Sequence, residues 1–161
     1  MTTRSGLGDV NAGAAWLLHA DSALPAFEIA GNVKVPTASA GLGTGKFDYA
    51  ALANVSHSIS PEFMVFGSVG YQWLSNFGTT TLEDGVTASA GVNFKPSPDF
   101  SIGVAGNYRQ EYFQGLGEQV SVSPYVLWNL SQNWRVTGYG TLGLTDASPR
   151  AGGGLRIIFA Q

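Results

Sequence analysis

The segment VTASAGVNFK, residues 86–95, alternates between apolar side chains and small or polar ones with a period of two. Such alternation is typical of a β-strand, because successive side chains in a strand point to opposite faces of the sheet. Clusters of turn-forming residues separate this segment from its neighbours. We find nine such segments, at about residues 7–18, 26–36, 46–57, 62–74, 85–95, 99–112, 118–130, 133–145 and 152–160. The sequence therefore predicts an all-β, antiparallel up-and-down fold of about eight to ten strands, forming one domain over residues 1–161.

The composition of the chain excludes several classes of protein. Only 12% of its 161 residues are charged and the net charge is -3, whereas an average soluble domain has about 25% charged residues. The absence of cysteine excludes disulfide scaffolds and cysteine zinc sites. A weakly acidic chain without a Lys/Arg cluster is a poor binder of nucleic acid. The apolar runs are far shorter than the roughly 20 residues that a membrane helix needs, although the chain has too few charges for an ordinary soluble surface.

The two faces of the predicted strands indicate a lipid environment. The polar face carries mostly Ser, Thr, Asn, Gly and Ala, rather than the Lys, Glu, Asp and Arg of a soluble sheet. On the apolar face, aromatic residues gather at both strand ends and flank an aliphatic band, which is the pattern of a transmembrane β-barrel. The predicted membrane-interface aromatics are Trp16, Phe27, Phe63, Phe94, Phe100, Trp128, Trp134 and Phe159 at one end, and Tyr49, Tyr71, Trp73 and Tyr108 at the other, with Phe47 and Tyr112 beside them. A water-soluble sandwich or barrel whose core is this apolar face is the alternative.

The lengths of the connections orient the predicted barrel. Those after the first, third, fifth and seventh strands are short, and those after the second and fourth are longer and rich in Gly and Thr. Outer-membrane barrels have short periplasmic turns and longer outer loops. We therefore expect a protein of the bacterial outer membrane, in contact with lipid or, once purified, with detergent. The first residues lack the apolar segment of a secretory signal, as in a mature or recombinant form.

The odd number of strands needs an explanation, because bacterial single-chain barrels have even numbers. Three explanations stay open at this point. One strand is miscounted, N-terminal strands are absent from the chain, or several chains share one assembly as a homo-oligomer.

Three short segments carry a resemblance to a known family. Residues 6–9 read GLGD at the start of the first strand, residues 34–37 read KVPT at the end of the second, and residues 41–45 read GLGTG before Asp48. In this order they resemble the outer-membrane channel family of the MetA pathway of phenol degradation. The resemblance implies a β-barrel that transports small, often aromatic compounds. Members of that family are longer and include strands before the GLGD element.

A group of charged residues faces inward near the end with the longer loops, at similar heights on four strands. Its members are Asp9, Lys34, Lys46, Asp48, Arg109 and Glu111. One interpretation is a mixed-charge constriction that orients a polar or zwitterionic solute. The other is a set of ion pairs that satisfy one another in a narrow lumen, because isolated buried charges are costly. The sequence leaves both interpretations open.

No arrangement of residues predicts catalysis. The two histidines, His19 and His57, fall at turns, and no nucleophile, base and orienting group converge. No cluster has the spacing of metal ligands, so we expect neither an enzyme nor a bound cofactor. Two functions remain: a passive outer-membrane channel for small, hydrophobic or aromatic solutes, and a closed structural or engineered scaffold barrel without transport activity.

Overall fold

Nine β-strands make up almost all of the regular structure. The computed structural model describes residues 6–19, 24–39, 43–76, 78 and 81–159, so residues 41 and 42 of the GLGTG segment lie outside the described part. The strands are β1 (Val10–His19), β2 (Ala26–Val35), β3 (Asp48–Ser58), β4 (Phe63–Trp73), β5 (Gly85–Ser97), β6 (Phe100–Arg109), β7 (Gln119–Asn129), β8 (Trp134–Gly143) and β9 (Ala151–Phe159). Among the residues described, no helix is long and apolar enough to span a membrane.

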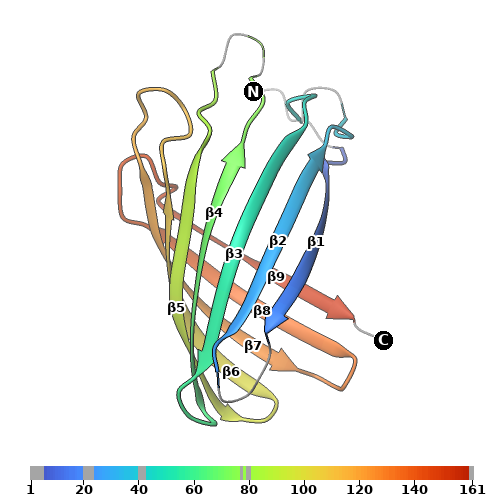
Figure 1. Ribbon diagram of the computed structural model, residues 1–161, viewed down its shortest axis with the longest axis vertical. Coiled ribbons are helices and arrows are strands. Elements are labelled where there is room, and N and C mark those ends of the chain that lie inside the picture. The colour runs from blue at the N-terminus through green and yellow to red at the C-terminus, as the bar shows by residue number, and fades with distance from the viewer. Residues whose placement is uncertain (1–5, 20–23, 40–42, 77, 79–80, 160–161) are drawn as a thin grey trace.

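The strands form a single antiparallel sheet in the order β1 to β9, each paired with the next along the chain. Figure 1 shows that this sheet curls strongly, so that β8 and β9 lie behind β1 and β2 in the view. Within the described part of the chain, no ladder joins β1 to β9. The sheet is therefore a curled half-barrel with two free edges. The prediction of an all-β, antiparallel up-and-down fold is confirmed.

The longer connections between strands all lie at one end of the sheet, and the shorter ones all lie at the other (Figure 1). We call the end at the top of Figure 1 the long-loop end; its connections span residues 36–47, 74–84, 110–118 and 144–150. The opposite, short-turn end has connections at residues 20–25, 59–62, 98–99 and 130–133. The chain thus alternates between one end made of tight turns and one made of extended loops.

The register keeps each face continuous across the sheet. One row of directly paired residues runs Ile29–Ala53–Val69–Ala88–Tyr108–Val120. The adjacent row, on the opposite face, runs Ala30–Leu52–Gly70–Thr87–Arg109–Gln119. A slip of one residue would exchange the two faces of a strand. The alternation within each strand therefore excludes pairings that are one residue out of register.

The apolar face of the sheet is exposed rather than buried. Trp16, Ile157 and Leu155 on this face are 75%, 65% and 78% exposed. Leu82, in the connection between β4 and β5, is the only buried hydrophobic residue in the described ranges. A soluble sandwich would bury this face as its core, so that alternative is wrong. An apolar face of this extent is stable against lipid and unfavourable against water.

The twelve aromatics predicted at the two strand ends, Phe47 and Tyr112 aside, lie on this apolar face. Several of them form ring pairs near the strand ends. The pairs are Phe63–Phe94 (4.6 Å between ring centroids) and Trp134–Phe159 (4.8 Å) at the short-turn end, and Tyr71–Trp73 (5.0 Å) at the long-loop end. Their contact with the membrane interfaces stays a prediction.

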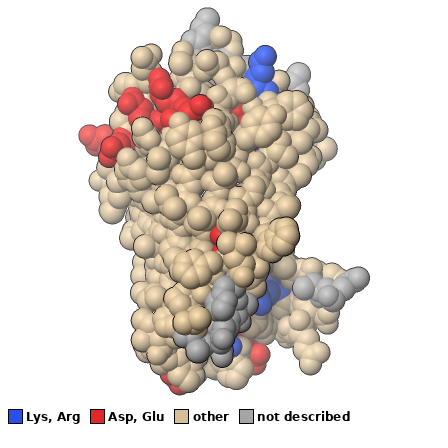
Figure 2. Space-filling model, viewed as in Figure 1, with Lys and Arg blue, Asp and Glu red and all other residues tan. Residues whose placement is uncertain are grey.

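Charged side chains gather towards the ends of the molecule. On the face seen in Figure 2, the middle of the molecule is almost entirely uncharged, and carboxylates cluster at the long-loop end. The β4–β5 and β6–β7 connections at that end contain Glu83, Asp84, Glu111 and Glu118. An uncharged band between two polar ends suits the hydrocarbon layer, where a charge on the lipid face is costly.

Aromatic rings on the polar face lie against the wall formed by the neighbouring strand. Each of three such residues is paired in register with a glycine, and a Cβ on that glycine would lie 2.7 Å or less from the ring or its hydroxyl; the pairs are Phe66–Gly91, Tyr125–Gly103 and Tyr139–Gly154. The Tyr125 hydroxyl also donates a hydrogen bond to Asn93 Oδ1 at 3.1 Å. Because these rings pack over glycines, they lie closer to the sheet than they would over a residue with a side chain, and they occupy less of the space that the sheet encloses.

Candidate functional site at the long-loop end

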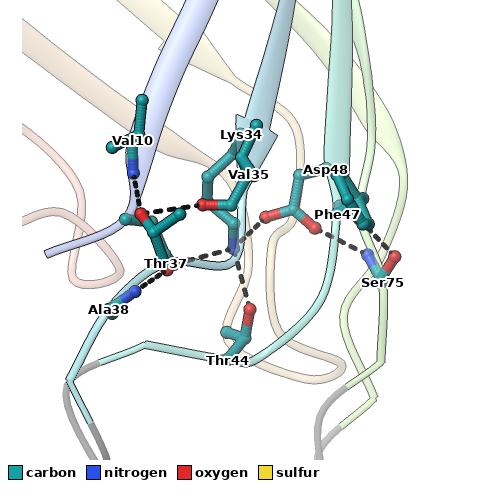
Figure 3. A network of polar contacts seen from close by, with 10 residues as sticks. Val10, Lys34, Val35, Thr37, Ala38, Thr44, Phe47, Asp48 and Ser75 are labelled. Carbon is teal, nitrogen blue, oxygen red and sulfur yellow. Dashed lines mark hydrogen bonds and ion pairs between the residues drawn. The ribbon is translucent and has the colours of Figure 1, made fainter.

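The centre of the candidate site is the ammonium group of Lys34, at the end of β2. Its Nζ lies 2.5 Å from Asp48 Oδ2 and donates a hydrogen bond to Thr44 Oγ1 at 2.8 Å (Figure 3). The same Nζ lies 3.6 Å from Asp9 Oδ2. Lys34 and Asp48 are direct partners in the β2–β3 ladder. The side chains of Lys34, Asp9 and Asp48 are 19%, 11% and 16% exposed. These charges are therefore largely shielded from water, and each acts strongly on the others.

The two carboxylates use their second oxygens to fix the loops. Asp9 Oδ1 accepts the backbone N–H of Ala38 at 2.9 Å, and Asp48 Oδ1 accepts the backbone N–H of Ser75 at 2.9 Å. The first bond attaches the β2–β3 connection to the segment before β1, and the second attaches the β4–β5 connection to β3. Charge and backbone hydrogen bonding thus hold three separate segments together.

Glycines and threonines of the KVPT and GLGTG segments also lie around Lys34, Asp9 and Asp48. Thr37 Oγ1 accepts the backbone N–H of Val10 at 2.9 Å. A Cβ on Gly43 would lie 2.8 Å from both carboxylate oxygens of Asp9, so this position has no room for a side chain. Gly45 has a φ of +67°, in the left-handed region that glycine adopts without strain. We call Asp9, Lys34, Thr37, Thr44 and Asp48 the Lys34 cluster.

A pocket of about 360 Å³ adjoins the cluster on the concave side of the sheet. Lys34, Asp48 and Arg109 all line it, although Arg109 lies on β6, three strands beyond β3. Strands that are not neighbours can line one pocket only if the sheet curls around it. The polar face is therefore the inner face. The remaining lining residues are Asn11, Asn32, Tyr49, Ala50, Leu52, Gln72, Leu74 and Tyr112.

Arg109 is held by an aromatic ring rather than by a carboxylate. Its guanidinium carbon lies 4.0 Å from the centroid of the Tyr112 ring, which is a cation–π distance. Tyr112 was expected beside the outward aromatics, and this expectation is wrong. The strand ends at Arg109, so the alternation of faces stops there and the following loop turns the ring inward.

The structure brings together some of the six predicted charged residues and separates others. Asp9, Lys34 and Asp48 form the cluster, and Arg109 shares its pocket. Lys46 lies exposed in the β2–β3 connection. The Glu111 carboxylate accepts the backbone N–H of Gly115 within its own loop. Whether any of the six contacts a solute stays a prediction.

Fold and site together define the class of this protein. A curled antiparallel sheet with an apolar exterior, aromatic strand ends and a polar, charged interior has the architecture of a transmembrane β-barrel. The chain belongs to the family described as "Putative MetA-pathway of phenol degradation", whose model matches residues 1–160. The resemblance inferred from the GLGD, KVPT and GLGTG segments is thereby confirmed.

Comparison with solved structures gives the same fold. The chain is similar to the crystal structure of an outer membrane channel from Pseudomonas putida F1, with a TM-score of 0.77 and 14% sequence identity. The similarity covers 96% of this chain and 68% of that one. No curated protein matches the chain in sequence. The fold is thus that of an outer membrane channel.

Proposed function

We propose that this protein is a non-enzymatic channel of the bacterial outer membrane, through which small solutes diffuse. The observation that carries the proposal is the inverted polarity of the sheet. Its apolar face is exposed and its polar face is concave, with a pocket among charged residues. A polar interior behind a lipid-facing wall is how membrane barrels provide a path for solutes.

The orientation follows from the loops. Outer-membrane barrels have long loops outside the cell and short turns in the periplasm, so we expect the Lys34 cluster to lie at the external mouth. A working channel also needs the edges of β1 and β9 to be paired, because lipid offers no hydrogen bonds to free backbone groups. Membership of the family supports small, aromatic solutes as the cargo.

The test begins with protein refolded in detergent and run on SDS gels with and without heating. A shift in mobility on heating reports a folded membrane barrel. Planar-bilayer recordings of the same preparation should then show ion conductance, and neutralising Arg109 should change the ion selectivity. A folded, heat-modifiable protein that never conducts would favour the scaffold alternative and overturn the channel proposal.

A further inference from the structure

The four charged groups beside the pocket differ in how far their hydrogen-bonding capacity is used. Lys34 contacts three oxygen acceptors, which matches the three donors of an ammonium group. Asp9 and Asp48 each use one carboxylate oxygen for Lys34 and the other for a backbone N–H. The hydrogen-bonding capacity of these three groups is thus used by contacts with one another and with the loops.

Arg109 is the exception. In the described part of the chain, no carboxylate lies within 4.0 Å of its guanidinium, and the guanidinium donates no hydrogen bond. Tyr112 covers one face of the group, which leaves the N–H donors at its edge unused. A guanidinium presents five donors in a planar fork that matches a carboxylate in bidentate geometry. The side chain is therefore held by Tyr112, and its N–H donors are available to a ligand.

The pocket has the size and the walls for a small amphipathic molecule. Its volume of about 360 Å³ lies within the roughly 300–1,000 Å³ of small-molecule sites. Leu52 and Leu74 contribute apolar surface, and Asn11, Asn32 and Gln72 contribute amides. We propose that Arg109 binds the carboxylate of a small organic monoacid of about the size of benzoate, with the apolar body of the acid against the two leucines.

The charge balance favours one negative charge on the ligand. Lys34 and Arg109 balance Asp9 and Asp48, so these four groups together have no net charge. A monocarboxylate can accept hydrogen bonds from the unused N–H donors of Arg109 and adds only one negative charge to the pocket. A dianion such as phosphate would place more negative charge near Asp48, which lines the same pocket and would repel it.

This inference rests on the proposed function, because it treats the pocket as part of a solute path. Its test is nevertheless a binding measurement that needs no conduction. Fluorine NMR of 4-fluorobenzoate, titrated with the protein in detergent micelles and referenced to protein-free micelles, gives the dissociation constant. We expect Arg109→Gln to weaken binding at least tenfold and Arg109→Lys, which keeps the charge and loses the fork, to weaken it less. The neutral analogue 4-fluorobenzamide should bind at least tenfold more weakly than 4-fluorobenzoate.

The matched control is Arg135→Gln. Arg135 faces the same side of the sheet at the short-turn end, where its Nε donates to Asn129 Oδ1 at 3.0 Å. This variant removes the same charge and should bind 4-fluorobenzoate as the parent does. Heat-modifiable mobility on SDS gels shows which variants are folded. Equal affinity of the parent and folded Arg109→Gln, equal affinity for acid and amide, or no binding by the parent would each overturn the inference. Binding without bilayer conductance would overturn the channel proposal and leave the carboxylate site standing.

Discussion

Replacing Lys34 with methionine tests whether the Lys34 cluster holds the long-loop end together. Methionine keeps most of the side-chain volume and removes the charge. The variant loses a 2.5 Å ion pair, a 2.8 Å hydrogen bond and a 3.6 Å charge contact. It also deprives two carboxylates, each less than one-fifth exposed, of the ammonium group that they share.

The magnitude follows from these contacts. A hydrogen bond to a charged group contributes about 1.5–3 kcal/mol, and removing one partner of a buried ion pair costs about 3–5 kcal/mol. The cluster is partly exposed, so we expect Lys34→Met to lower the free energy of unfolding by about 3 kcal/mol. Asp9→Asn loses only the long contact, since its Oδ1 can still accept the Ala38 N–H. We expect it to cost about 1 kcal/mol or less.

The assay is urea unfolding of the protein folded into lipid vesicles, followed by the fluorescence of its four tryptophans. A triple variant with Lys34→Met, Asp9→Asn and Asp48→Asn removes all three charges and should recover most of the loss, because no charge is left unpaired. The reasoning is refuted if Lys34→Met costs no more than Asp9→Asn, or if the triple variant is no more stable than Lys34→Met alone.

Three further tests, two of them with a matched control variant, probe the packing and the polarity of the sheet with the same urea assay. Gly43→Ala places a methyl group 2.8 Å from a carboxylate of the Lys34 cluster and should lower the free energy of unfolding by about 1–3 kcal/mol. Gly8→Ala, whose methyl group has nothing within 4 Å, should lower it little, and equal effects of the two variants would contradict the packing. Gly103→Ala places a methyl group 2.3 Å from the tyrosine ring above it and should cost about 1–3 kcal/mol, so an unchanged stability would show that the ring does not pack there. Val104→Arg puts a charge on the apolar face and should lower the free energy of unfolding by about 2–4 kcal/mol. Ala105→Arg, on the inner face, should lower it less, and the reverse order would contradict the assignment of the two faces.

Several features of the fold could be predicted from short stretches of sequence. The alternation in β5 and β6 defines the lipid face and the inner face, because side-chain direction in a strand depends only on the parity of the position. The strand bounds follow from turn-forming residues, and the observed strands lie within a few residues of the predicted ones. Alternation also places Lys34 and Asp48 on the inner face, whereas their direct pairing comes from the observed register of β2 and β3.

Other features depend on the whole sheet. The position of Tyr112 could not be predicted by parity, because the alternation ends with the strand at Arg109 and loop geometry takes over. The commitment of Glu111 to its own loop could not be predicted either, since it depends on a backbone N–H four residues away that the turn brings into reach.

The sequence by itself determined which residues lie on the exposed apolar face, which face inward and which family the chain resembles, because these depend on local alternation and short motifs. Only the tertiary structure decided which inward charges meet. Arg109 on β6 reaches the pocket of Lys34 and Asp48 through the curl of the sheet. That curl is the sum of the twist between every pair of neighbouring strands, and no single segment of the sequence specifies it.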